Sequence, residues 1–183
     1  MGRRPFVRER ILVAAFDLVA RRSYEAVSTR EIAQAAGVGP TSMYRHFATK
    51  EELGRELYAR ALPPVHTMVA EALEQRPETD QAQRLIAGLV HGLYRCYDER
   101  PRACALLIFP PHDFMPEELA PGNPDALRSR LLATLGDEDL AAICWGAITG
   151  PLADRFLHRR GGSMYSHADN HTALVSRLLP TRP

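Results

Sequence analysis

Apolar residues recur every three or four positions along almost the whole sequence, a spacing typical of helices with one buried face. No segment shows the run of alternating apolar and polar residues that predicts a half-buried strand. The sequence therefore predicts an all-α fold of about nine helices, separated by glycine and proline. With 183 residues, the chain is long enough to bury a sizeable core without disulfide bonds or metal ions.

The clearest helix start lies at Ser28. Ser28 followed by Glu31 forms a capping box, in which each side chain bonds a backbone amide that the first turn leaves free. Val27 and Ile32 stand where a hydrophobic staple requires apolar residues. We expect this helix to end at Gly37, since glycine commonly follows the last helical residue.

A second short helix follows within a few residues. Pro40 suits the first turn of a helix, and the helix is predicted to continue over residues 41–47. Two short helices joined by a tight, glycine-bearing turn form a helix-turn-helix, whose second helix enters the major groove of DNA. Residues 28–47 fit this layout.

The composition of the second helix separates a DNA reader from an ordinary helical hairpin buried in a bundle. A buried helix would carry an apolar inner face and charges outside. This one instead offers small hydroxyls, an aromatic ring, an arginine and a histidine, in the stretch "GPTSMYRHF". Such groups bond phosphates and base edges, so the pattern favours DNA binding.

The charge distribution agrees with a polyanion partner. The net charge of +1 combines a net of +4 in residues 1–60 with a net of −3 in the remainder. The basic excess therefore lies in the part of the chain that contains the helix-turn-helix.

The segment "STREIAQAAGVGPTSMYRHFATKEEL" resembles the DNA-binding signature of TetR-family transcriptional regulators. The resemblance covers about the first 55 residues, and the remainder is similar to the family only in its helical character and length. The residues that match the signature at the family's spacing are Thr29, Ile32-Ala33, Ala36-Gly37-Val38, Tyr44, Phe47, Lys50 and Leu53.

Lys50, the only lysine of the chain, stands where a fourth helix is expected to begin, although a helix N-terminus disfavours a cation. The resemblance implies that Lys50 contacts the DNA backbone. A phosphate that approaches a helix N-terminus is attracted by its free amides, and Lys50 adds a formal charge. The alternative is a solvated lysine paired with Glu51 or Glu52.

The resemblance also implies that the Tyr44 hydroxyl reaches a phosphate and that His46 lies in a backbone-contact position, with packing as the alternative for both. Met43 and Phe47 are assigned to packing. Reading of bases is expected from the first residues of the second helix and from Arg45. The complete set of predicted DNA-binding residues is Thr29, Arg30, Gly39, Pro40, Thr41, Ser42, Tyr44, Arg45, His46 and Lys50.

Two positions depart from the family's usual pattern. Gly39 stands where serine or threonine usually caps the recognition helix, and Thr41 stands where glycine is frequent. No operator sequence can therefore be inferred by analogy. A basic arm is also predicted to follow the DNA backbone or minor groove, or to be disordered, and it consists of Arg3, Arg4 and Arg8.

The chain is predicted to contain a helix-turn-helix domain at 1–50 and an effector-binding and dimerisation domain at 51–183. A fourth helix, about 50–75, connects them, with a kink or break at Pro63-Pro64. Thr79 is expected to cap the next helix. Further expected elements are a short apolar piece at 102–109, a loop at 110–122, a helix from Asn123-Pro124 to Gly136, and helices at 137–160, kinked at Pro151, and 167–179.

A single helix-turn-helix reads too few base pairs for high specificity, so a homodimer on a near-palindromic operator of double-stranded DNA is expected. The resemblance implies that the last two helices, 137–160 and 167–179, form the dimer interface. The first of them is apolar nearly all round, and Gly146 and Gly150 would let helices approach closely. The alternative is that this apolar surface packs internally in a monomer.

The resemblance further implies a pocket for a small hydrophobic effector between the middle helices. The walls would be apolar with a few hydroxyls, as in most small-molecule sites. Each of these residues is individually also a reasonable core position. The candidate lining residues are His91, Tyr94, Tyr97, Cys104, Phe109, Phe114, Trp145 and Thr149.

The sequence contains none of the hydrolase, phosphate-loop or zinc-protease motifs, so an enzyme is not expected and no cofactor is predicted. Three widely spaced cysteines and the lack of a long apolar run indicate a cytoplasmic protein that does not cross a membrane. No metal is predicted, although two weak constellations exist: His167 and His171 with His158, and His91 with Cys96 and Cys104.

Together, the residues and the resemblance predict a dimeric transcriptional regulator, a repressor released from its operator by a small hydrophobic effector. Two alternatives stay open. One is a DNA-binding regulator without a small-molecule effector, controlled by its abundance or by a protein partner. The other is a metal-sensing protein.

Overall fold

The computed structural model describes residues 7–22, 24–76, 80–108, 126–158 and 161–180. Within these ranges the chain forms helices and no strand, as the sequence predicts. The helices are α1 (Val7–Arg22), α2 (Thr29–Ala35), α3 (Pro40–His46), α4 (Lys50–Glu74), α5 (Gln81–Glu99), α6 (Pro101–Ile108), α7 (Leu127–Leu135), α8 (Glu138–His158) and α9 (Ala168–Ser176), with the 3₁₀ helix η2 (Tyr165–His167) before α9.

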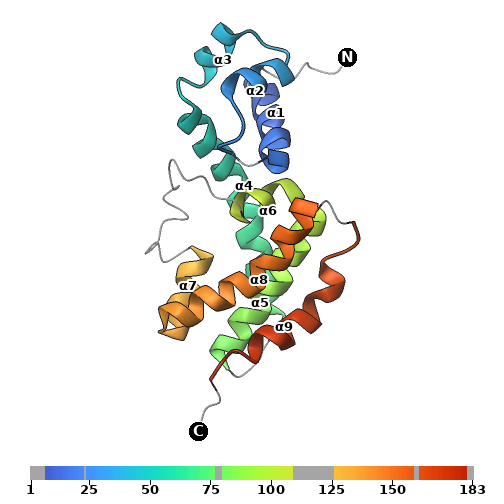
Figure 1. Ribbon diagram of the computed structural model, residues 1–183. Coiled ribbons are helices and arrows are strands. Elements are labelled where there is room, and N and C mark those ends of the chain that lie inside the picture. Colours follow the sequence, from blue (N-terminus) through green and yellow to red (C-terminus); the bar gives the residue numbers. More distant parts are fainter. Residues whose placement is uncertain (1–6, 23, 77–79, 109–125, 159–160, 181–183) are drawn as a thin grey trace.

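Helices α1, α2 and α3 gather at one end of the molecule, and α5, α7, α8 and α9 lie at the other (Figure 1). Helix α4 runs from the first group into the second, where it packs along α5 (Figure 1). None of the helices in the described part is long and apolar enough to cross a membrane.

The capping box predicted at the start of α2 is confirmed. The Ser28 hydroxyl accepts a hydrogen bond from the Glu31 amide at 3.2 Å, and the Glu31 carboxylate accepts one from the Ser28 amide at 2.9 Å. The bonds from Ser28, with the neighbouring Arg22 guanidinium, lower the pKa of Glu31 from 4.5 to about 2. Gly37 then takes a φ of +63°, a left-handed conformation that favours glycine.

The predicted break of the fourth helix at Pro63-Pro64 is wrong, because α4 continues through both prolines. The two rings remove the hydrogen bonds to the carbonyls of Ala59 and Arg60. Both of these residues are exposed, so water can bond the freed carbonyl oxygens. Helix α8 likewise continues through Pro151.

Three helix boundaries differ from the expectation. Asp80, not Thr79, caps α5, since its carboxylate accepts bonds from the amides of Ala82 at 2.9 Å and Gln83 at 3.0 Å. Helix α7 begins at Leu127, later than expected. The predicted start at Asn123-Pro124 and the predicted loop at 110–122 lie outside the described residues, as does Thr79. The last α-helix covers only Ala168–Ser176, because its first turn is the separate 3₁₀ helix η2.

The core of the larger group of helices depends on the close approach of α4 and α5. A Cβ atom added at Gly92 would lie 2.5 Å from the Val69 Cα, so the α5 backbone nearly touches the α4 backbone there. One turn away, a Cβ atom at Gly88 would instead meet the Leu73 side chain, at 2.4 Å from Cδ2. A side-chain end can rotate away, whereas a backbone cannot.

We therefore expect Gly92→Ala to destabilise the protein by about 1–3 kcal/mol, because the two helices must move apart. The matched variant Gly88→Ala should lose less, since only the Leu73 side chain has to move. Urea unfolding at equal protein concentration measures both free energies. Equal losses, or a greater loss for Gly88→Ala, would contradict this account of the α4–α5 contact.

Candidate nucleic-acid interface

Helix α3 packs one side against α2 and leaves the other to solvent. Met43 and Phe47 are each 1% exposed, which confirms that both serve packing. Tyr44, one position after Met43, is 55% exposed. Tyr44 therefore lies on the outer face of α3, where its ring and hydroxyl are open to a partner.

Three of the predicted DNA-binding side chains converge from three different helices. Thr29 on α2, Tyr44 on α3 and Lys50 on α4 line one shallow hollow of about 480 Å³. The Thr29 and Tyr44 hydroxyl oxygens lie 3.3 Å apart. Glu25, Glu31 and Glu51 line the same hollow, and the Glu31 carboxylate is already bonded to Ser28 and Arg22. The two hydroxyls and the ammonium are the groups suited to the oxygens of a phosphate.

Lys50 is the first residue of α4, where the positive end of the helix dipole disfavours a cation. Two neighbouring groups offset this effect. The Nζ atom lies 4.5 Å from the centre of the Tyr24 ring and 3.4 Å from the carbonyl oxygen of Glu25. The Tyr24 hydroxyl in turn donates to the Lys50 carbonyl. The ring face and the carbonyl dipole both attract the cation.

The alternative pairing of Lys50 with a neighbouring carboxylate is not what the structure shows. The Glu52 carboxylate accepts a bond from the Ala48 amide at 2.8 Å, next to the α4 cap. Among the described residues, no carboxylate oxygen lies within ion-pair distance of the Lys50 Nζ. The ammonium is therefore held by the Tyr24 ring and the Glu25 carbonyl, while Glu51 lies near enough for the Lys50 charge to add to the hydrogen bonds that lower the Glu51 pKa.

The remaining predicted DNA-binding residues belong to α2, to α3 and to the N-cap of α3, at the same end of the molecule (Figure 1). Ser42 and His46 are half-buried. Gly39 caps α3 with its backbone alone, in keeping with the absence of a capping side chain. Arg30, Gly39, Pro40, Thr41 and Arg45 are exposed.

The predicted basic arm is wrong for Arg8, which lies inside α1. The Arg8 guanidinium pairs with Glu56 at 3.0 Å and covers the Phe47 ring at 4.9 Å from its centre. Arg8 therefore joins α1, α3 and α4 rather than extending from the fold. Arg3 and Arg4 lie outside the described residues.

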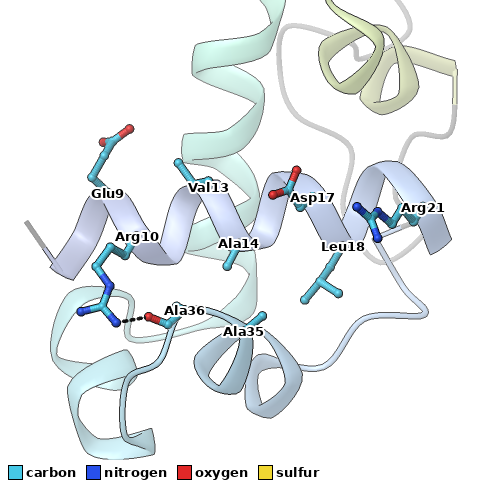
Figure 2. A pocket seen from close by; sticks show the side chains of 9 residues that line it. All are labelled: Glu9, Arg10, Val13, Ala14, Asp17, Leu18, Arg21, Ala35 and Ala36. Atoms are coloured by element: carbon cyan, nitrogen blue, oxygen red, sulfur yellow. Dashed lines mark hydrogen bonds between the residues drawn. The ribbon is translucent and has the colours of Figure 1, made fainter. Parts of the chain in front are cut away.

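Arg10 supports the helix-turn-helix in a way that the sequence analysis missed. Its Nη2 atom donates to the Ala36 carbonyl (Figure 2) and to the Gly37 carbonyl, the latter at 3.0 Å. Arg10 stands beside the groove between α1 and α2, so it ties α1 to the turn that orients α3 (Figure 2). No local pattern reveals such a contact, because its two partners are carbonyls 26 and 27 positions away.

The described side chains among those predicted for an effector pocket make contacts within the protein. The Tyr94 hydroxyl lies 2.7 Å from His171 Nδ1, and Cys104 faces the Leu93 carbonyl at 3.8 Å. His91 lines a separate cavity with Arg76. The Tyr97 ring packs edge-on against Phe156, the Thr149 hydroxyl donates to the Trp145 carbonyl, and Phe109 and Phe114 lie outside the described residues.

The two weak metal constellations do not form ligand sets in the described ranges, where no three histidine, cysteine or acidic side chains converge on a metal position. The His167 and His171 rings stack on each other at 5.9 Å between centres. The neighbouring Cys104 thiol is the main cause that lowers the pKa of Cys96.

Comparison with known proteins identifies the helix-turn-helix end. Residues 11–57, which contain α2, α3 and the hollow at Lys50, match the model of the bacterial regulatory proteins of the tetR family. The N-terminal part of this chain belongs to the TetR family. This match confirms the resemblance seen in the sequence.

An uncharacterized HTH-type transcriptional regulator of Haemophilus influenzae is 46% identical over 55 residues, which are 30% of this chain and 27% of that protein. The alignment thus spans about a quarter of that relative.

Solved structures extend the similarity of fold to nearly the whole chain. A TetR-like transcriptional regulator from Rhodococcus sp. RHA1 has a TM-score of 0.64 at 18% identity, with 97% of each chain covered. The regulator FadR of Bacillus subtilis, in complex with stearoyl-CoA, has a TM-score of 0.58 at 15% identity, with 91% of this chain and 96% of that chain covered.

We expect Lys50→Ala to weaken DNA binding and to reduce the salt dependence of the affinity by about one released counterion. The matched control is Arg128→Ala, which removes one exposed positive charge from α7, at the other end of the molecule (Figure 1). Fluorescence anisotropy on one duplex at several salt concentrations gives both slopes. An unchanged slope for Lys50→Ala would show that its ammonium does not meet the backbone.

Proposed function

We propose that this chain is a dimeric, sequence-specific DNA-binding transcriptional regulator, a repressor that a small molecule releases from its operator. The observation that carries the proposal is the convergence of Thr29, Tyr44 and Lys50 on one exposed hollow within the family-matched segment. In this proposal the hydroxyls and the ammonium hold a DNA phosphate, and the exposed start of α3 reads bases in the major groove.

Within this proposal, residues 1–50 act as the reading domain, α4 as the connection and residues 51–183 as the effector-binding and dimerisation domain. A ligand that prefers one spacing of the two reading domains would lower DNA affinity through its different affinity for the two states. The FadR structure with bound stearoyl-CoA supports the idea that this fold can hold a small molecule.

The proposed dimer rests on an apolar surface of α8 and of the chain at and after α9. Leu157 is 70% exposed and Ile143 is 57% exposed, both on α8. Leu174 and Leu178 are 49% and 41% exposed. A Cβ atom at Gly146 or Gly150 would meet nothing within 4 Å, so this side of α8 is open to close approach by another helix. A partner copy would cover these side chains.

The second candidate is a regulator that binds DNA without a small-molecule effector. It is favoured by the complete burial of Tyr94 and Cys104, both 0% exposed and bonded within the protein, since such residues serve the core. DNA binding does not separate the two candidates. A ligand that raises the melting temperature of the protein and releases it from DNA would favour the effector model.

Selection from a random duplex library tests the DNA-binding part. We expect the wild-type protein to recover a near-palindrome with half-sites about 34–36 Å apart, or a multiple of this spacing. The double variant Tyr44→Ala/Lys50→Ala should recover no motif, while Arg128→Ala should recover the wild-type one. Identical motifs from the wild type and the double variant, or none from either, would refute the assignment of the hollow.

Sedimentation tests the dimer. We expect the wild-type protein to sediment as a dimer and Leu157→Glu to sediment as a monomer, because a buried unpaired carboxylate opposes association. Leu132→Glu on α7, where the leucine is 39% exposed, is the control that should stay dimeric. A dimeric Leu157→Glu protein would place the interface elsewhere.

A further inference from the structure

A small cavity that the proposed effector pocket does not account for lies where the end of α4, helix α5 and η2 meet. Its volume is about 260 Å³, below the range of drug-sized ligand pockets. Met68 and Ala72 add apolar surface to a polar lining that comes from Gln75, Arg76, His91, Arg95 and Tyr165. We refer to this space as the Arg76 cavity.

His91 is the polar side chain that the described core buries, at 4% exposure. The Arg76 Nη2 atom lies 2.7 Å from its Nε2 and 3.0 Å from its Nδ1, and the Tyr165 ring meets it edge-on at 5.4 Å between centres. Burial, with the adjacent Arg76 charge, lowers the pKa of His91 despite the opposing Asp169 carboxylate. At neutral pH the imidazole is therefore uncharged, and Arg76 carries the charge.

The two arginines of the cavity differ in how far they are neutralised. Arg95 donates to Glu71 at 2.7 Å and lies 3.1 Å from Glu99, so its charge is balanced twice. Arg76 has one carboxylate, Asp169, whose Oδ1 is 3.6 Å away, beyond a normal hydrogen bond. The Arg76 guanidinium is thus the available cation, and it matches a single negative charge.

Asp169 occupies the place that an external anion would take. Its Oδ1 lies 3.2 Å from His91 Nε2, yet its side chain is 92% exposed. An exposed ion pair contributes little, so a rotation of Asp169 into water costs little. A free carboxylate could then present both oxygens to the Arg76 fork, which a carboxylate fixed on α9 does not do here.

We propose that the Arg76 cavity binds a short organic monocarboxylate, which replaces Asp169 on Arg76 and His91 and lays its alkyl part against Met68 and Ala72. The volume suits a short chain, and the single unbalanced charge disfavours a dianion. Asp169 stands in the first turn of α9, so its release removes one link between α9 and the α4–α5 pair. Any effect of this release on DNA affinity rests on the proposed function, whereas the binding itself does not.

Calorimetric titration of the DNA-free protein with sodium butyrate tests the site. We expect Asp169→Asn to bind butyrate about two- to fivefold more tightly than the wild type, because the weakly held competing carboxylate is gone. Arg76→Ala should lose binding, and Arg76→Lys, which keeps the charge but not the paired donors, should be weakened. Arg84→Ala is the matched control with unchanged binding, since Arg84 bonds the Leu73 carbonyl outside the cavity.

A second readout locates the ligand. Butyrate should shift the NMR signals of the His91 ring and leave those of exposed His158 unchanged. Three outcomes would overturn the proposal. The wild type and Arg76→Ala could bind butyrate equally well, or neither the wild type nor Asp169→Asn could bind it. The protein could also bind inorganic phosphate in place of butyrate. Because no DNA is present, a failure here leaves the DNA-binding proposal standing, and the reverse also holds.

Discussion

The unbroken course of α4 is the constraint on which the other parts of the structure depend. The helix has 25 residues, which corresponds to a length of about 38 Å. Its first residue, Lys50, lies in the hollow between α2 and α3, and Val69, toward its other end, touches the α5 backbone at Gly92. One continuous helix, rather than a loop, therefore connects the α5 contact with the helix-turn-helix.

Helix α6 is bonded to α1 and to α4. Asp17 on α1 pairs with Arg102 on α6, and the Tyr58 hydroxyl of α4 donates to the Leu106 carbonyl of α6 at 3.0 Å. Helix α6 thus contacts both α1 and α4. The orientation of the helix-turn-helix is set by packing against α4 and α6 together, and within it by the bond from Arg10 to the turn.

Lys50 and Arg76 are two cations with unusual local surroundings. A lysine at a helix N-terminus is mildly unfavourable, and the structure offsets this cost with the Tyr24 ring and the Glu25 carbonyl rather than with a carboxylate. Asp169 shows the opposite arrangement, since it balances Arg76 from an exposed position and leaves that arginine open to competition. In both places the protein keeps a cation ordered but incompletely neutralised.

Local signals predicted the helix-turn-helix closely because its determinants are close in the chain. The Ser28–Glu31 box, the left-handed Gly37 and the inward Met43 and Phe47 all depend on neighbours within one or two turns. The predictions that were wrong concern helix continuity at proline and the identity of a capping residue, which the local sequence does not decide. The prolines of α4 are compatible with a continuous helix only because the freed carbonyls belong to exposed residues, and Asp80 rather than Thr79 caps α5.

By itself, the sequence determined the helical class, the start of the helix-turn-helix and the residue types on its outer face. Periodicity and capping act over a few residues, so the local sequence is enough to specify them. Only the tertiary structure decided which distant groups meet: Arg10 with the turn, Arg8 with Glu56, and Arg76 with His91 and Asp169. These contacts depend on how whole helices pack, and that packing is selected by the shape and volume of many side chains at once.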